Sequence, residues 1–463
     1  MHSLSLLAGA ARVDITPPLG TIINGDFVRH YARYIHDPLY AKALVLQNQE
    51  ITLAIVIVDI CVMPKDFLDE VKAGIAARTG IPYTHILISS THTHAAGSIA
   101  DVHLVGADLG YRKKLPGLLV ESVVKAKEKV RPAQVAFGSV AVPEHVVCRR
   151  YIMKDGYKPV NPVTDSTDTV KTNPIGAESW IDQRAAPTDP EVSFLAVQDT
   201  AGNWISLLAN YSLHYVGDWE NGTISADYFG VFSEQIRQRL DAGDDFVGIM
   251  SNGTSGDVNI WDFLKPDRYP NRYFEKSKLI GSDIAARVAN ATENLEWHSA
   301  PVLEALYQEL PLAVNKPGPA ELERAIGILE QSDYENVFAD EAGLRSIYAR
   351  EQILLNEFPD EAACPVQALR IGNGVVGGLP GEFFAETGLW LKAQSPVQHY
   401  FTISLANGNA GYVPPPDEIS RGGYETWRCR ISCLEAEAER KIREALLRQI
   451  LALSDAAVQT SRL

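Results

Sequence analysis

The chain of 463 residues is poor in cysteine, has no long apolar run and carries fewer basic than acidic residues. Its five cysteines are an odd number, are scattered along the chain and form no CxxC pair, so we expect no disulfide framework, and a reducing cytoplasm suits them. No apolar run is long enough to span a membrane. The net charge of −16 disfavours nucleic acid and anionic membranes as partners, because both require a basic face.

Several nucleotide-binding and hydrolase motifs are also missing. There is no GxxxxGKS/T phosphate loop, no GxGxxG after a strand, and no GxSxG nucleophile elbow. The start of the chain faintly resembles the apolar region of a signal peptide, but it is short and lacks a basic segment. We therefore expect mature sequence and a cytoplasmic protein whose partner is a small-molecule substrate. Self-association into a homo-oligomer is left open.

Apolar segments along the chain predict strands and helices. Residues 53–58 and 85–90 are expected to be strands and residues 65–78 between them a helix, a unit that favours a parallel strand pair. A hairpin is expected from strands over 192–197 and 204–211. Further strands are predicted over 135–142, 367–371, 374–376 and 400–405, and further helices over 115–130, 229–241, 275–294, 319–331, 340–356 and 433–453.

These elements predict an α/β protein with a mixed, largely parallel β-sheet core flanked by helices, in a single elaborated catalytic domain. No repeat, low-complexity tract or clear linker divides the chain. We therefore expect one domain over residues 1–455 and a frayed tail over 456–463. Residues 154–190 are rich in Pro, Thr, Asp and Asn, which predicts a long irregular segment that shapes a site.

Two histidines stand at the end of the strand predicted over 85–90, in the segment Thr91-His92-Thr93-His94. The carboxyl end of a buried strand is the usual ligand site of an α/β sheet. His92 and His94 lie two residues apart, so on extended backbone they face the same way, and neutral imidazole is a common ligand of Zn²⁺. Taken alone, the pair is equally compatible with two polar histidines that cap a strand.

Three further segments place a reactive side chain at a strand end or in a turn, namely His214, Glu382 and Tyr412. Each also has a purely structural interpretation. His214 could be a core histidine with satisfied hydrogen bonds, Glu382 a charge at a helix N-terminus, and Tyr412 a packing residue. Taken together with the histidine pair, the three residues indicate a mononuclear metal site.

A series of motifs in a fixed order covers nearly the whole chain. They are AARVDITPPLG (10–20), IHDPLYAKALVL (35–46), ILISSTHTHAAG (86–97), CRRYIMKDG (148–156), PTDPEVSFLAV (187–197), NYSLHYVG (210–217), ISADYFG (224–230), SGDVN (255–259), LPGEFF (379–384), NGNAGYVPPPDE (407–418) and GGYE (422–425). In this order they resemble the N-terminal catalytic domain of the neutral/alkaline non-lysosomal ceramidases.

The resemblance implies a catalytic Zn²⁺ held by His92, His214, Glu382 and Tyr412. His94 would line the site, where a histidine can transfer protons near neutral pH. Arg149 or Arg150, together with Tyr424, would bind or polarise the substrate, and such groups can stabilise a tetrahedral oxyanion.

Four more residues near the motifs have open roles. Asp59 and Asp227 are candidates to orient the ligand histidines, with caps of strand ends as an equally good interpretation. The family has a serine near its GDVSPN motif, but here the stretch is longer and its Ser-Pro is lost. A catalytic role for Ser251 or Ser255 is therefore left open.

Departures from the family's pattern bear on the substrate. The family carries a C-terminal immunoglobulin-like domain and is secreted or membrane-attached, whereas we expect this chain to lack both that domain and an export signal. Arginines in or beside the site motifs favour a polar or acidic substrate, such as a sugar acid. These arginines are Arg149, Arg150, Arg421 and Arg428. The alternative is that they form structural ion pairs in an acidic protein, and this interpretation is preferred for Arg428.

The sequence thus predicts a zinc-dependent hydrolase that cleaves an N-acyl amide bond by metal-activated water, on a small polar substrate rather than on long-chain ceramide. The alternative is a metal-dependent carbohydrate-active lyase or hydrolase that acts on a sugar acid or an oligosaccharide. A third interpretation, a metal-bound protein without catalysis, is disfavoured because every apparent ligand is retained.

Overall fold

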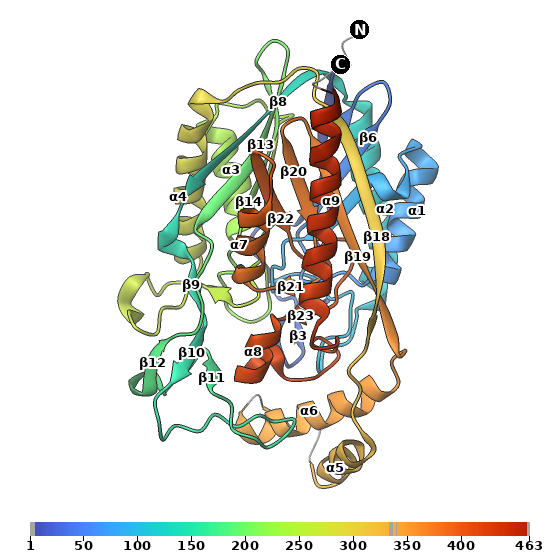
Figure 1. Cartoon of the computed structure of the whole chain (residues 1–463). Helices are drawn as coiled ribbons and strands as arrows, with labels where there is room; N and C mark the ends of the chain where they lie inside the picture. Colours follow the sequence, from blue (N-terminus) through green and yellow to red (C-terminus); the bar gives the residue numbers. More distant parts are fainter. Residues whose placement is uncertain (1–4, 333–336, 339, 461–463) are drawn as a thin grey trace.

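The computed structural model describes residues 5–332, 337–338 and 340–460, with side chains up to residue 454. Two β-sheets share a core, and helices cover their outer faces (Figure 1). The larger sheet has eight strands in the order β16-β14-β13-β8-β1-β5-β6-β7. Their bounds are β1 Leu7–Asp14, β5 Tyr40–Gln47, β6 Thr52–Val58, β7 Ile86–Ser90, β8 Arg131–Ala141, β13 Glu191–Asp199, β14 Trp204–Tyr211 and β16 Val247–Asn252.

The larger sheet is mixed, as predicted, but most of its strand pairs are antiparallel. Only the outermost pairs, β6 with β7 and β14 with β16, are parallel. The predicted helix-linked parallel pair and the predicted hairpin of β13 and β14 are both confirmed. The expectation of a largely parallel sheet is wrong, because short turns such as residues 48–51 join several central strands, and a short turn must reverse the chain.

The smaller sheet has the strand order β18-β19-β20-β22. Its strands are β18 Leu303–Ala313, β19 Glu361–Ile371, β20 Gly374–Gly378 and β22 His399–Ile403. Alternate residues of one strand enter different cores. Phe194 and Ala196 of β13 pack with helices, whereas Leu195 and Val197 pack in the core between the two sheets. Burial on both faces explains the continuous apolar runs in the sequence.

Nine helices within the described residues surround the sheets. They are α1 Lys65–Thr79, α2 Leu109–Glu128, α3 Asp227–Arg239, α4 Glu275–Ala291, α5 Pro319–Leu329, α6 Glu341–Asn356, α7 Ala385–Gln394, α8 Pro416–Arg421 and α9 Ala438–Thr460. Helices α1 and α2 cover one half of the larger sheet, α3 and α4 the other half, and α7 and α9 the smaller sheet. None of these helices is both long and apolar enough to cross a membrane.

Two predicted helices differ by five or more residues at an end. Helix α2 starts six residues earlier than expected, because the side chain of Asp108 accepts a hydrogen bond from the Tyr111 N–H and caps the helix there. Helix α9 starts at Ala438 and continues to Thr460, so the predicted tail is helical up to residue 460, and residues 461–463 lie outside the described part of the chain.

The segment predicted to be irregular, 154–190, contains two short strands. β11 (Val170–Thr172) and β12 (Ile181–Arg184) flank β10 (Arg150–Met153) in a three-stranded sheet. In Figure 1 this small sheet lies with α8 at the lower end of the molecule, near α5 and α6. These elements lie below the ends of the main strands, where the candidate site residues gather.

Candidate metal and substrate site

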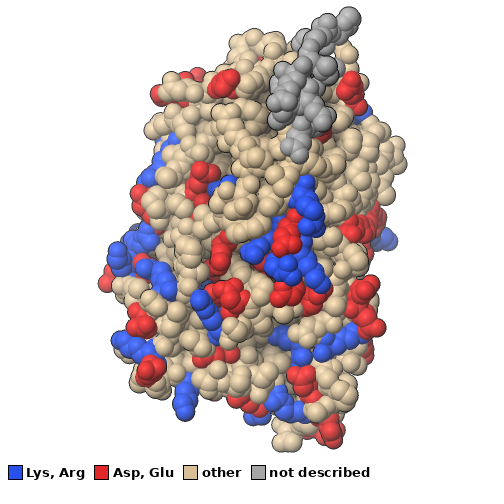
Figure 2. Space-filling model, viewed as in Figure 1, with Lys and Arg blue, Asp and Glu red and all other residues tan. Residues whose placement is uncertain are grey.

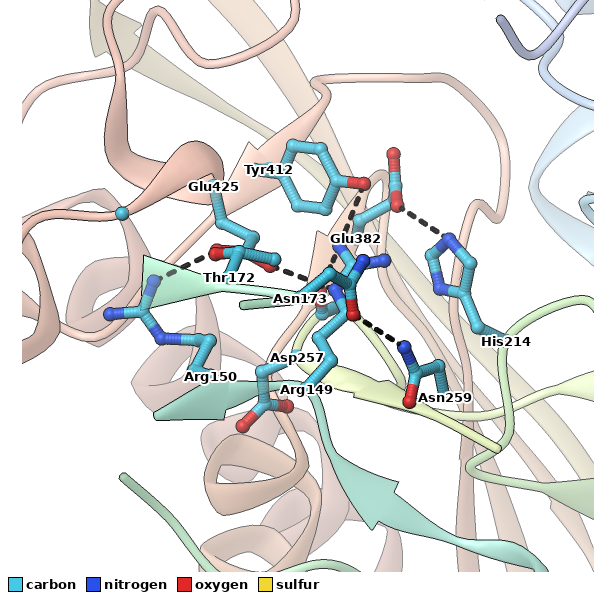
Figure 3. Close-up of polar contacts among 12 residues, drawn as sticks. Arg149, Arg150, Thr172, Asn173, His214, Asp257, Asn259, Glu382, Tyr412 and Glu425 are labelled. Carbon is cyan, nitrogen blue, oxygen red and sulfur yellow. Dashed lines mark hydrogen bonds and ion pairs between the residues drawn. The ribbon is translucent and has the colours of Figure 1, made fainter. Parts of the chain in front are cut away.

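Three buried side chains from separate strand ends meet at one point. His92 follows β7, His214 follows β14, and Glu382 lies in the short strand β21 (Glu382–Phe383). Nε2 of His92 lies 3.4 Å from Oε2 of Glu382. Nε2 of His214 lies 3.6 Å from the same oxygen atom (Figure 3). Two imidazole nitrogens and one carboxylate oxygen within 4.8 Å of one another form a ligand set that suits Zn²⁺.

The donor atoms of this cluster face one another, and two of them have no hydrogen-bond partner among the described residues. His214 Nε2 and Glu382 Oε2 are buried and make no hydrogen bond within the part of the chain that the structure describes. On the far side of each ring, His92 Nδ1 lies 2.9 Å from the carbonyl oxygen of Cys61, and His214 Nδ1 lies 3.1 Å from that of Ser255. A carbonyl only accepts, so each Nδ1 carries the proton and Nε2 is left to bind a metal. The residues present therefore fit a metal ion.

The two carboxylates that could have oriented these histidines make other contacts. Asp59 accepts hydrogen bonds of 2.8 and 2.9 Å from Lys42 Nζ. Asp227 accepts from the backbone N–H groups of Val216 and Gly217, and burial raises its pKa to about 7. Of the two interpretations left open by the sequence, orientation of a ligand histidine is therefore wrong for both carboxylates, and each binds other groups of the protein instead.

His94 lies beside the cluster and lines the adjoining cavity. Its Nε2 is 3.1 Å from that of His92, and its ring stacks on Tyr215 with centroids 3.7 Å apart. The two histidines converge as expected, although His92 has a φ of +70°, so the backbone there is left-handed rather than extended. Burial lowers the pKa of His94, and burial and then the charge of Arg149 lower the pKa of His214, so both rings are favoured in their neutral form.

Two tyrosines stand next to the cluster. Strand β23 (Tyr412–Val413) pairs in parallel with β21, which sets Tyr412 opposite Glu382. The ring of Tyr424 lies edge-on to that of Tyr412, with centroids 5.4 Å apart, and both rings line the cavity. Burial raises the pKa of both phenols. Glu382 and Tyr412 therefore belong to one two-stranded unit, and Tyr424 packs against it.

The adjacent arginines have different surroundings. Arg149 lines the cavity, donates from Nε to Glu425 at 2.8 Å and from Nη2 to Tyr412 Oη at 3.0 Å, and its Nη1 makes no hydrogen bond to the described residues. Arg150 is fully buried, is not part of the cavity wall, and donates to Glu425 and Glu418 at 2.8 Å each. Arg149 can thus contact a substrate, whereas the structure gives Arg150 no direct contact with the cavity.

The two serines of open role make structural hydrogen bonds. Ser251 Oγ donates to the backbone of Ala209, and Ser255 Oγ donates to the side chain of Asn252. Both serines are buried, and neither is part of the cavity wall. Their placement offers no nucleophile to a substrate in this cavity.

The cluster borders a cavity of about 510 Å³ with a mixed lining. Aromatic and polar residues alternate around it, including Phe27, Tyr215, Trp219, Trp261 and Trp427 as well as Asn24, Asp26, Lys171, Asn173 and Asn221. The segment predicted to shape a site does so through residues 171–173 and 175. The lining residues 23–27, 219 and 221–223 were not predicted, because no ligand or catalytic motif marks them and only folding brings them to the site.

Comparisons with known proteins show the family and the fold of the chain. A sequence model of the neutral/alkaline non-lysosomal ceramidases, N-terminal region, matches residues 6–261, more than half of the chain. The chain belongs to this family. Its fold resembles the crystal structure of neutral ceramidase from Pseudomonas aeruginosa, with a TM-score of 0.73 at 17% identity, covering 98% of this chain and 75% of that one. A ceramidase complexed with C2 matches with a TM-score of 0.72 at 17% identity, covering 98% and 76%.

No curated protein matches the chain in a direct sequence comparison. Ceramidases of this family are metal-dependent hydrolases in general, so family membership supports a hydrolase that acts on a small-molecule substrate. The matched region includes His92, His94, Arg149 and His214. Glu382, Tyr412 and Tyr424 lie beyond that region, and the three-dimensional arrangement joins them to it.

Proposed function

We propose that the chain is a zinc-dependent amidase that hydrolyses the N-acyl bond of a small polar substrate. The observation that carries the proposal is the buried cluster of His92, His214 and Glu382 beside the cavity, in which His214 Nε2 and Glu382 Oε2 have no hydrogen-bond partner among the described residues. In this proposal Tyr412 completes the ligand set, because it lies opposite Glu382 across the β21–β23 pair. A zinc ion in such a site supplies a water of lowered pKa and polarises a carbonyl oxygen.

The remaining chemistry is assigned to side chains around the cluster. His94, with a lowered pKa, is neutral at pH 7 and can take a proton from the attacking water and pass it to the leaving nitrogen. Tyr424 keeps its phenolic proton because burial raises its pKa, so its O–H can donate to the developing oxyanion. Arg149 adds a fixed positive charge to the same cavity.

The cavity favours a small polar substrate over a lipid with two long chains. Its volume of about 510 Å³ lies in the range of sites for small molecules. Arg149, Lys171 and Asn173 provide donors on its wall, so the proposed substrate carries an anionic group such as a carboxylate. A cytoplasmic location is proposed as well, since all five cysteines are free thiols.

A substrate screen tests this function. The purified protein, loaded with zinc, is assayed against short N-acyl amino acids, against their uncharged amide analogues and against long-chain ceramide in detergent. We expect release of the free amine from the short anionic amides, loss of activity after chelation and recovery on addition of zinc. Robust hydrolysis of ceramide with no turnover of short amides would overturn the proposed substrate class.

Three tryptophans on the cavity wall favour a second candidate, a carbohydrate-active enzyme. Trp219, Trp261 and Trp427 offer flat apolar faces on which a sugar ring can pack. The same screen therefore includes acidic oligosaccharides. An unsaturated product that absorbs in the ultraviolet would identify a lyase, and new reducing ends without such absorption would identify a glycoside hydrolase.

A further inference from the structure

The acidic residue that follows Tyr424 is buried and stands outside the cavity wall. Glu425 lies in a single 3₁₀ turn (Tyr424–Thr426), and its side chain has no exposed surface. Oε1 accepts from Arg149 Nε at 2.8 Å, while Oε2 accepts from Arg150 Nη1 at 2.8 Å and from Thr172 Oγ1 at 2.7 Å (Figure 3). Charge-assisted bonds on both oxygens hold this carboxylate in one orientation.

Arg149 extends this fixed geometry to Tyr412. A guanidinium group is planar, so the bond from Nε to Glu425 sets the plane in which Nη2 lies. From that position Nη2 donates to Tyr412 Oη at 3.0 Å and to the Gly256 carbonyl oxygen at 2.7 Å. Tyr412 in turn is in register with Glu382 of the metal cluster. Glu425 is thus connected to the ligand set through one arginine.

We infer that Glu425 is a positioning residue, which holds the guanidinium of Arg149 against the hydroxyl of Tyr412 and so fixes the phenol oxygen before metal and substrate bind. The inference rests on the proposed role of Tyr412 as a metal ligand. Glu425 touches neither the substrate nor the metal. Without its carboxylate charge, the fork of Arg149 loses the bond that sets its plane, and the phenol oxygen of Tyr412 loses its fixed donor.

The chain offers a matched control in Glu418. This carboxylate is also buried and also binds an arginine fork, accepting from Arg150 Nη2 at 2.8 Å and from Arg421 Nη1 at 2.6 Å. It makes no contact with Arg149 among the described residues. Glu418→Gln therefore removes a buried charge of the same kind from the same network without releasing Arg149.

The experiment compares zinc affinity by chelator competition in the wild type, Glu425→Gln and Glu418→Gln, with thermal unfolding measured on each. Loss of a residue that orients a ligand typically weakens metal binding about 10- to 100-fold. We expect that loss in Glu425→Gln and near wild-type affinity in Glu418→Gln, although both variants unfold at lower temperature. In a Tyr412→Phe background, Glu425→Gln should have no further effect on zinc affinity, because the group it positions is gone.

Several results would overturn the inference: wild-type zinc affinity in Glu425→Gln, an equal loss in Glu418→Gln, or the full loss in the Tyr412→Phe background. If Glu425→Gln does not fold, Thr172→Val is used in its place. This variant removes one of the three bonds to Glu425 and should weaken zinc binding by a smaller factor, so unchanged zinc binding would count against the inference.

Failure of the proposed amidase is seen separately, as wild-type protein that binds zinc but releases no amine. If the wild type binds no zinc, the inference is tested by crystal structures of the metal-free variants. An unchanged contact between Arg149 and Tyr412 in Glu425→Gln would then contradict the positioning role of Glu425.

Discussion

At the scale of single residues, main-chain carbonyls orient the candidate ligand histidines. His92 and His214 each direct Nδ1 to a backbone oxygen, from Cys61 and Ser255 respectively. A carbonyl does not ionise in the physiological range, so this orientation is independent of pH, unlike one provided by a carboxylate. The arrangement leaves both Nε2 atoms aimed at Glu382.

Three histidine variants test the assignment of metal ligands. His92→Ala and His214→Ala are expected to lose most of the bound zinc, because each removes one of three clustered donors. His94→Ala should keep the zinc and lose turnover by about 10²- to 10⁴-fold, the usual loss for a general acid or base. Elemental analysis after gel filtration measures the zinc content. A full equivalent in both His92→Ala and His214→Ala would refute the site.

Replacement of each neighbouring arginine by lysine tests their different surroundings. Arg149→Lys should lower kcat/KM for a carboxylate-bearing amide more than for its uncharged analogue, because lysine cannot reproduce the planar guanidinium that binds Glu425 and Tyr412 and keeps Nη1 as a further donor. Arg150→Lys should instead lower the free energy of unfolding, since Arg150 is buried between Glu418 and Glu425. Kinetics on the paired substrates and urea unfolding measure the two effects. Equal sensitivity of both substrates to Arg149→Lys would contradict an anionic substrate.

At the scale of elements, the two-residue strands β21 and β23 bring Glu382 and Tyr412 together. The approach is close because Gly411, just before β23, has a φ of +70° and a Cβ there would collide with the backbone carbonyl of Ile431. Gly381, just before β21, similarly leaves no room for a Cβ next to the carbonyl oxygen of Gly411. Two glycines thus allow two short strands to carry two site residues.

Gly411→Ala tests this packing. The substitution combines a strained φ with a backbone collision, so it should lower the free energy of unfolding by more than the roughly 1–3 kcal/mol of backbone strain alone, and should weaken zinc binding. Gly20→Ala is the matched control, because Gly20 has a φ of +88° with no atom near its absent Cβ. Urea unfolding and chelator competition measure both variants. A loss of stability no greater than that of Gly20→Ala would show that β23 can shift freely.

At the scale of the whole molecule, charged side chains lie both on the surface and in the interior. On the face drawn in Figure 2, acidic and basic side chains are interspersed and form no continuous basic patch, which accords with the net charge of −16.

The interior contains a charged residue type as well. Lys72 of α1 is fully buried, and its Nζ has no hydrogen-bond partner among the described residues. The ammonium lies 4.6 and 5.0 Å from the ring centroids of Tyr83 and Tyr307, and burial lowers its pKa to about 7.

Lys72 should make stability depend on pH. The unfolded chain keeps the Lys72 proton up to its ordinary pKa of 10.5, whereas the folded chain releases it at about pH 7, so unfolding takes up a proton between these values. The free energy of unfolding should therefore rise as pH increases from 7 towards 10. Lys72→Met should remove this rise and stabilise the protein at pH 7 by roughly a few kcal/mol. Urea unfolding of both proteins between pH 7 and 9.5 measures the difference, and parallel pH profiles would contradict the prediction.

The sequence by itself determined most of the strands and helices, the order of the motifs and the residue types of the metal site. Apolar periodicity is a local property, so the strand before His92 and the hairpin that ends near His214 were predictable from short segments. The relative direction of the central strands was harder to predict from the sequence. One strand–helix–strand unit predicts one parallel pair, but it gives no information about strands that are joined by short turns.

Only the tertiary structure decided which of two adjacent arginines reaches the cavity and what orients the histidines. Arg149 and Arg150 are neighbours in sequence, yet their carboxylate partner Glu425 lies 276 and 275 residues away. Arg149 precedes strand β10 and Arg150 begins it, and long-range contacts fix the two side chains in different surroundings. Such contacts leave no local pattern in the chain, because their cause is the approach of segments that only the packed sheets bring together.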